Sequence, residues 1–256
     1  MNASLPMYDF PDCRDANDRY WALIRQGLQA KAVDAPEALT RDVPDLMAHW
    51  QRYDLVLSQT CGMPYKLALH GKVTLIGTMD YAVEGCPPGY YNSVFVARAQ
   101  DMRDSVSAFR DARFAYNQAH SNSGWATAQT HAAGLGFQFR PLLETGAHAL
   151  SAHAVMDGLA DIAAIDAVTW RLLQRNDATM AGLRVVERTK PTPGLPYISA
   201  LGANHRVMFD AIAGALTNLS ASDRETLGVK RLLFIPPVAY LAVPTPALAP
   251  SVASIA

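Results

Sequence analysis

Phe114-Ala-Tyr-Asn-Gln-Ala-His-Ser121-Asn122-Ser123-Gly124-Trp125 is a short apolar run followed by a loop rich in hydroxyl and amide groups. We expect a β-strand, the loop, and then the start of a helix. Backbone N–H groups at a helix start lack partners and carry partial positive charge, and Ser121, Asn122 and Ser123 add side-chain donors there. This arrangement is typical of an anion-binding site, although the same residues also serve as ordinary helix caps.

The composition indicates a globular protein with a substantial core. Of the 256 residues, 50% are hydrophobic and 18% are charged, which suits one large domain or two small ones. The net charge of −1 argues against a general nucleic-acid-binding protein, which needs a basic surface. A small anionic ligand held by neutral dipoles is compatible with this charge.

The sequence contains no pattern that predicts a metal site or a membrane span. Cys13, Cys61 and Cys86 form no CxxC pair and no cluster with metal-ligand spacing, so we expect neither a metal nor another cofactor. The longest apolar region, around residues 160–170, is interrupted by two aspartates and is shorter than a membrane span. The N-terminus shows no secretory leader, so either the protein stays in the cytoplasm or a leader was removed.

Apolar β-type runs alternate with helical patterns along the chain, which indicates an α/β fold with mostly parallel sheet. Ligands bind such sheets outside the carboxyl ends of the strands. Polar loops fall at these ends, and they contain Tyr8-Asp9, Gln59–Tyr65, Asn117–Ser123, Thr145–His148 and Asp166. Their convergence predicts one binding cleft.

Four residues outside the serine-rich loop are candidates for contact with an anion. His148 would donate from its ring, and Tyr8 and Tyr65 would each offer a hydroxyl. Asp166 has two interpretations: it caps the following helix, or it accepts a ligand proton or pairs with a ligand amine. The second role would reject sulfate-like anions, which carry no proton.

Catalysis has weak support in the sequence. There is no GxSxG, P-loop or GxGxxG motif. Ser123, His148 and Asp166 are the residue types of a catalytic triad, but their spacing carries no signature of one. We therefore assign no catalytic residue.

Four segments resemble those of a known family. They are the loop with Tyr65, the Ser121–Gly124 loop, Gly146-Ala-His148 with Ser151, and Val155-Met-Asp-Gly-Leu-Ala-Asp-Ile-Ala-Ala-Ile-Asp166. With them the chain resembles the phosphate/phosphite/phosphonate-binding proteins of ABC transporters (PhnD-like), within the type II periplasmic binding protein superfamily. The resemblance covers nearly the whole chain. Family members often have Ser-Thr-Ser where this chain has Ser-Asn-Ser.

The resemblance implies two α/β lobes with mixed, mostly parallel sheets, a hinge and a central cleft. Lobe one would comprise residues 1–93 and 199–256, and lobe two residues 94–198, with crossovers near Tyr91–Phe95 and Tyr197–Ala200. A small phosphorus oxyanion would bind in the cleft, and the lobes would close on it. The ligand-binding residues would be Tyr8, Tyr65, Ser121, Asn122, Ser123, His148 and Asp166.

The resemblance further implies the solute-binding component of an ABC-type uptake system, located in the periplasm, with a transporter permease as partner and no enzymatic activity. Two alternatives stay open. One is an enzyme on the same scaffold, similar to the pyrimidine synthases of thiamin biosynthesis. The other is a ligand sensor similar to the effector lobe of LysR-type regulators, which would be cytoplasmic if the leaderless N-terminus is native.

Overall fold

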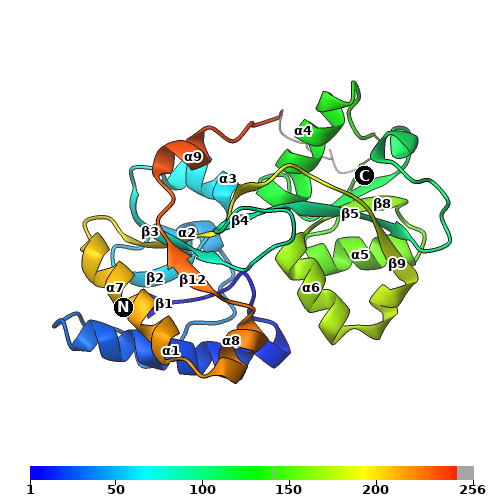
Figure 1. The fold of residues 1–256 in the computed structure, drawn as a ribbon. Coiled ribbons are helices and arrows are strands. Elements are labelled where there is room, and N and C mark those ends of the chain that lie inside the picture. The colour runs from blue at the N-terminus through cyan, green and yellow to red at the C-terminus, as the bar shows by residue number, and fades with distance from the viewer. Residues whose placement is uncertain (141, 247–256) are drawn as a thin grey trace. The chain divides into compact units, whose positions relative to one another are not determined.

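A computed structural model describes residues 1–140 and 142–246 and divides the chain into two compact units. Unit 1 consists of Met1–Tyr91 and Pro191–Ala242, and unit 2 of Asn92–Lys190 together with the described tail residues 243–246. The chain therefore leaves unit 1 after Tyr91 and returns to it at Pro191. Both units contain helices and a β-sheet, coloured along the chain in Figure 1.

Unit 1 contains a five-stranded mixed sheet in the order β1-β2-β11-β3-β12. β1 and β2 pair in parallel, β11 is antiparallel to both β2 and β3, and β12 is antiparallel to β3. β2 and β3 therefore run in the same direction on either side of β11. The strands are β1 (Asn2–Ala3), β2 (Leu55–Gln59), β3 (Val73–Asp80), β11 (Pro196–Ala200) and β12 (Arg231–Leu233).

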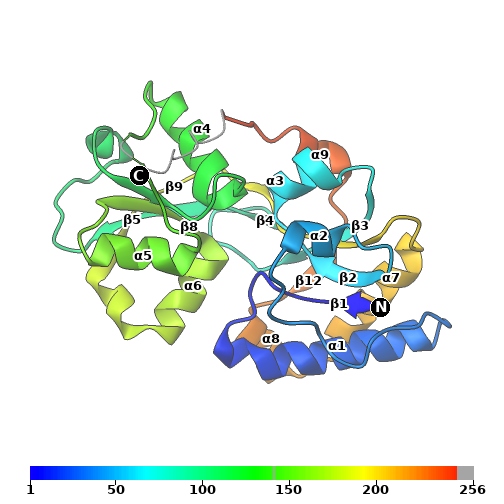
Figure 2. The same cartoon turned by 180° about the vertical axis from the view of Figure 1, so that it is seen from behind.

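The first long helix of unit 1, α1, has a buried apolar face. Tyr20, Ile24 and Leu28 recur every four residues on α1, a spacing that places them on one face of the helix, and they are at most 1% exposed. In Figures 1 and 2, α1, α7 and α8 lie together on one side of the unit. The helices are α1 (Arg14–Gln29), α2 (Leu46–Trp50), α3 (Gly62–Pro64), α7 (His205–Asn218), α8 (Ala221–Leu227) and α9 (Pro237–Leu241).

Unit 2 contains a second mixed sheet, in the order β7-β6-β8-β5-β9. β6 is parallel to β7 and β8, whereas β5 is antiparallel to β8 and β9. Phe114 and Phe139 are fully buried and stack with ring centroids 4.3 Å apart; each buried ring stabilises the fold by roughly 1.5–3 kcal/mol. The elements are β5 (Ser93–Arg98), β6 (Phe114–Tyr116), α4 (Thr127–Gly134), β7 (Leu142–Glu144), α5 (His148–Met156), β8 (Ile162–Asp166), α6 (Ala167–Asn176) and β9 (Leu183–Arg188).

The sheets are mixed, as predicted, but they are not mostly parallel. β5 and β11, the strands nearest the passages between the units, are antiparallel to both of their neighbours. Tyr197–Ala200, expected to be a crossover, lies within β11 of unit 1. The return passage comes earlier, where β10 (Thr192–Pro193) pairs antiparallel with β4 (Tyr90–Tyr91). A β-rich run has the same local pattern in a crossover and in a sheet, so the sequence did not distinguish them.

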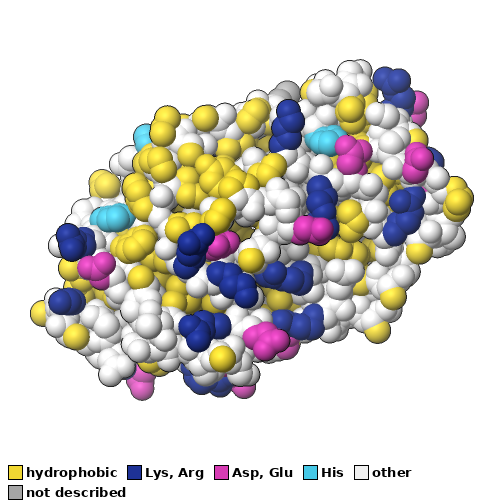
Figure 3. Space-filling view, in the orientation of Figure 1, with side chains coloured by type: hydrophobic (Ala, Val, Ile, Leu, Met, Phe, Trp, Pro, Cys, Tyr) yellow, Lys and Arg dark blue, Asp and Glu magenta, His cyan; other side chains and the backbone are white. Residues whose placement is uncertain are grey.

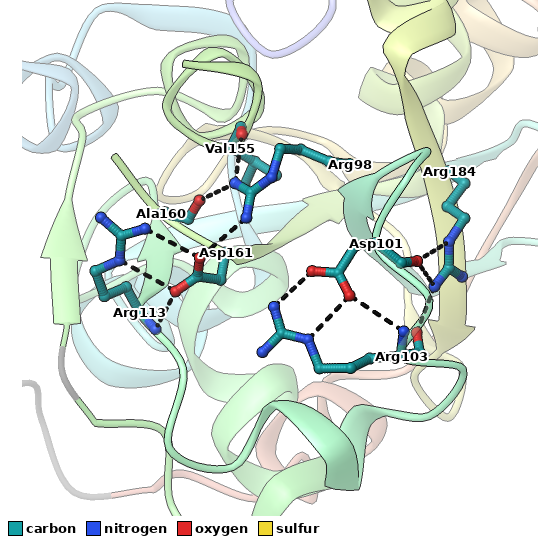
Figure 4. A network of polar contacts seen from close by, with 8 residues as sticks. All are labelled: Arg98, Asp101, Arg103, Arg113, Val155, Ala160, Asp161 and Arg184. Carbon is teal, nitrogen blue, oxygen red and sulfur yellow. Dashed lines mark hydrogen bonds and ion pairs between the residues drawn. The ribbon is translucent and has the colours of Figure 1, made fainter. Parts of the chain in front are cut away.

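A network of arginines fixes the start of β8, at the opposite end of this strand from Asp166 (Figure 4). Asp161 immediately precedes β8 and accepts hydrogen bonds from Arg113 (backbone N–H, Nε and Nη2, 3.0–3.1 Å) and from Arg98 Nη2 (3.0 Å). Arg98 Nη1 donates to two backbone carbonyls as well. The two guanidinium groups hold the pKa of Asp161 well below its usual range.

We expect Asp161→Asn to lower the free energy of unfolding at neutral pH by about 2 kcal/mol, because the amide no longer pairs with two arginines. The loss should shrink in acid. A carboxylate with a depressed pKa contributes stability that is complete above its unfolded pKa of about 4 and is lost progressively as the pH falls from that value toward the lower pKa of the folded state. Urea unfolding at neutral pH and at about pH 3 measures both effects.

Asp210→Asn is the matched control for this variant, because Asp210 forms an exposed ion pair with Arg206 on α7. Exposed pairs of this kind contribute about 0.5 kcal/mol or less. Equal losses in the two variants would mean that the Asp161 network contributes no more than a surface pair.

The surface drawn in Figure 3 carries lysine and arginine side chains interspersed with aspartate and glutamate. Several of the basic side chains lie close together in this view, while the chain as a whole carries a net charge of −1. Among the described residues, no helix combines the length and the apolar character needed to cross a membrane.

Candidate functional site

The loop after β6 enters a helix through the residues predicted to bind an anion. Ser121 is the N-cap: its backbone is extended (φ −74°, ψ 134°), and its Oγ accepts from the Gly124 N–H at 3.0 Å. The turn η4 (Asn122–Ala126) is π-helical, closed by the Ala126 N–H on the Ser121 carbonyl at 3.0 Å, and α4 continues it. Single π-turns are frequent at functional sites. We call Ser121–Gly124 the serine turn.

The backbone of the serine turn is held from two directions. The Ser123 carbonyl accepts from Ser93 Oγ at 2.8 Å and from Thr127 Oγ1 at 3.1 Å. Ser93 begins β5 and Thr127 begins α4, so a strand and a helix both fix Ser123. All three residues are buried, which makes the position of the Ser123 hydroxyl a rigid feature of unit 2.

The loop after β7 brings His148 to the serine turn. The Gly146 N–H donates to the Asn117 carbonyl at 2.7 Å, which fastens this loop to the exit from β6. α5 then begins at His148, whose Nε2 lies 2.9 Å from Ser123 Oγ. The two loops meet because β6 and β7 are parallel neighbours and end at the same edge of the sheet.

The serine turn and His148 offer hydrogen-bond donors without a positive charge. Burial lowers the pKa of His148 to about 4, and the nearby backbone at Ala164 opposes this shift only in part, so the ring is neutral near pH 7. When Nε2 carries the ring proton, it donates to Ser123 Oγ and leaves the Ser123 O–H able to donate elsewhere. The Ser121 hydroxyl accepts from Gly124 and likewise keeps its own O–H for donation.

Asp166 ends β8 and caps α6. Its Oδ1 accepts from the N–H groups of Val168 (2.7 Å) and Thr169 (2.9 Å), so the capping interpretation is correct. Asp166 is 3% exposed and lies opposite Ser93 in the β5–β8 ladder. Because Ser93 also holds the Ser123 carbonyl, Asp166 lies at the same edge of the sheet as the serine turn. The cap is made by Oδ1 of the carboxylate.

The two tyrosines among the predicted binding residues belong to unit 1. Tyr65 is 2% exposed, its ring packs against Tyr240 with centroids 5.2 Å apart, and burial raises its pKa. Tyr8 packs edge-on against Tyr81 at 5.0 Å and borders a cavity of about 20 Å³. Both rings therefore lie in the packed interior of unit 1. Unit 2 holds the others: Ser121, Asn122, Ser123, His148 and Asp166.

The residue types of a catalytic triad do not form one here. Ser123 and His148 are hydrogen-bonded, but His148 Nδ1 is buried without a hydrogen-bond partner among the described residues. A triad needs a carboxylate on that nitrogen to orient the ring. In residues 1–140 and 142–246, no group of three or more His, Cys, Asp or Glu side chains is placed to hold a metal ion.

The family model of the periplasmic phosphonate substrate-binding protein of ABC transporters matches residues 45–234. The chain belongs to this phosphonate-binding family. The matched region contains the serine turn, His148 and Asp166. The family drawn from the sequence is thereby confirmed, and with it the class of solute-binding proteins. A sequence search of curated proteins found no match.

Solved structures of phosphonate-binding proteins have a similar fold. PhnD1 from Prochlorococcus marinus, in complex with methylphosphonate, is 15% identical with a TM-score of 0.70, over 93% of this chain and 94% of that one. The binding protein of an ABC phosphonate transporter from Pseudomonas aeruginosa is 14% identical with a TM-score of 0.64, over 91% and 80%. A chloride-bound protein from Xanthomonas citri is 14% identical with a TM-score of 0.68, over 93% and 92%. These likenesses confirm the predicted periplasmic-binding-protein fold.

The residues that sequence reasoning missed in this phosphonate-binding family member support the serine turn from behind. Thr127 carried a readable signal, since it lies four residues after Ser123, where a helical hydroxyl reaches back to a carbonyl. No local sequence signal identifies Ser93, because its contact with Ser123 depends on the pairing of strands that are distant in the sequence.

Proposed function

We propose that the chain binds a small phosphorus oxyanion (a phosphonate, phosphate or phosphite) at the serine turn, as the solute-binding component of an ABC-type uptake system. The observation that carries the proposal is the neutral donor set of Ser121, Ser123 and His148, held at one edge of the unit 2 sheet. The two serine hydroxyls, with Asn122 and backbone N–H groups of the turn, would hold the oxygens of the anion. Neutral dipoles also avoid the desolvation cost of a buried positive charge.

Asp166 would set the selectivity of this site. A carboxylate beside an oxyanion repels it unless the ligand keeps a proton or carries an amine. Phosphonates and phosphate retain an ionisable proton near neutral pH, whereas sulfate does not. The site would therefore reject sulfate and accept the phosphorus anions.

Family membership supports the remaining parts of this proposal. They are a periplasmic location, a transporter permease as partner, and binding without chemical turnover. PhnD1 from Prochlorococcus marinus, which holds methylphosphonate, supports that compound as the first ligand to test.

The test is thermal unfolding with methylphosphonate, aminoethylphosphonate, phosphate and phosphite, with sulfate as the matched anion. A ligand present at about 100 times its Kd raises the free energy of unfolding by about 2.7 kcal/mol. We therefore expect a clear rise in Tm with at least one phosphorus anion and none with sulfate. Ser123→Ala should reduce the rise, and Ser107→Ala, at an exposed position of unit 2, should leave it unchanged. If no phosphorus anion raises the Tm, the proposal is wrong.

A further inference from the structure

Two side chains pack directly on the Cα of Gly124. A Cβ added there would lie 2.0 Å from Asn117 Oδ1, 2.9 Å from Asn117 Cγ and 3.2 Å from His148 Cε1. Gly124 does not have a left-handed backbone, so glycine is required here because of this close approach alone. Asn117 is therefore built into the serine turn together with His148.

Asn117 is the first residue after β6, and its two carbonyl groups have different environments. Its backbone carbonyl accepts from the Gly146 N–H at 2.7 Å, which holds the residue between the loops that follow β6 and β7. Its side-chain Oδ1 is buried and has no hydrogen-bond partner among the described residues. Buried amide oxygens are rarely left in this state, and a functional role is one of the recognised reasons.

The contact with Gly124 also orients the Asn117 amide. An oxygen can rest against a Cα–H group as a weak acceptor, whereas an NH2 group gains nothing there. The oxygen therefore faces Gly124, and the NH2 group lies at the other end of the planar amide. Within residues 1–140 and 142–246 this NH2 group makes no hydrogen bond, so both of its hydrogens are available to a ligand.

We propose that Asn117 is a further ligand-binding residue, whose NH2 group donates to an oxygen of the anion held at Ser121–Ser123. The inference rests on the proposed function and deepens it. A phosphonate group presents three strong acceptor oxygens, which is more than two serine hydroxyls satisfy. Asn117 adds a donor from the end of β6, and this donor is uncharged like those of the serines and His148.

Asn117→Asp tests the inference, because it keeps an oxygen against Gly124 and replaces only the NH2 group by a second oxygen. We expect methylphosphonate binding, measured by calorimetry, to weaken by at least about hundredfold, since a donor becomes a charged acceptor. Asn117→Ala removes the amide and should weaken binding about tenfold. Thermal unfolding without ligand shows that each variant is folded.

Gln118→Glu is the matched control, because it adds the same charge on the neighbouring exposed side chain. Solvent screens that charge, so we expect a change in Kd of less than about threefold. If the wild type binds methylphosphonate and both Asn117 variants bind it equally well, Asn117 only packs against Gly124 and the inference is overturned, while the proposed function stands. A wild type that binds no phosphorus oxyanion would overturn the proposed function and this inference together.

Discussion

Gly124→Ala is expected to weaken methylphosphonate binding about hundredfold and to lower the free energy of unfolding by roughly 1–3 kcal/mol. The new Cβ would lie 2.0 Å from Asn117 Oδ1 and 3.2 Å from His148 Cε1, so the Asn117 side chain must move and the His148 ring must shift. Because His148 is hydrogen-bonded to Ser123, the shift disturbs the donor group itself. Titration calorimetry and urea unfolding give the two quantities.

Gly134→Ala is the matched control for this variant. A Cβ at Gly134, the last residue of α4, meets nothing within 4 Å. Alanine is favoured over glycine in a helix by about 0.5–1 kcal/mol, so binding should be unchanged and stability should not fall.

The double variant Gly124→Ala/Asn117→Ala removes the side chain that the new Cβ meets. It should recover part of the stability that Gly124→Ala loses, because neighbouring substitutions are not additive. Wild-type affinity in Gly124→Ala alone would show that close packing of the serine turn is not needed for binding.

Asp166→Asn is expected to change which anions bind, with little effect on stability. Asparagine caps helices about as well as aspartate, so the bonds to the Val168 and Thr169 N–H groups can persist. We expect the wild type to bind methylphosphonate at least about a hundredfold more tightly than methanesulfonate, which has a similar shape and no proton to donate. In Asp166→Asn the ratio should fall to about tenfold or less, because the repelling carboxylate is gone.

Asp177→Asn provides the control for the chemical change itself. Asp177 caps the 3-10 turn η5 (Ala178–Gly182) of the same unit by accepting from the Thr179 N–H at 2.9 Å. This variant should leave the affinities for both anions unchanged. If Asp166→Asn retains the wild-type preference for methylphosphonate, Asp166 is only a helix cap and the selectivity has another source.

Local periodicity predicted many of the elements correctly and failed where packing decides the conformation. The spacing of Tyr20, Ile24 and Leu28 gave the buried face of α1. In contrast, the apolar pattern that leads into β7 does not separate the strand, Leu142–Glu144, from the residues before it, among which Phe139 is buried in the core of unit 2. A strand and a buried aromatic segment share the same apolar pattern, so the sequence alone does not separate them.

The sequence predicted which residue types form the candidate site, but it did not predict the contacts between them. Ser121, three residues before Gly124, is a capping signal that the structure uses. The packing of Asn117 on Gly124 depends on side-chain torsions in a loop, and the support of Ser123 by Ser93 depends on how β5 and β8 pair. Neither contact has a local sequence signature.

The central claim is that the serine turn binds a phosphorus oxyanion, and calorimetric titration of methylphosphonate into the wild-type protein tests it most directly. We predict saturable binding at one site per chain, strongly weakened in Ser123→Ala, since that variant lacks the hydroxyl that His148 positions. A folded wild-type protein that gives no binding heat with methylphosphonate, and none with phosphate or phosphite, would contradict the claim.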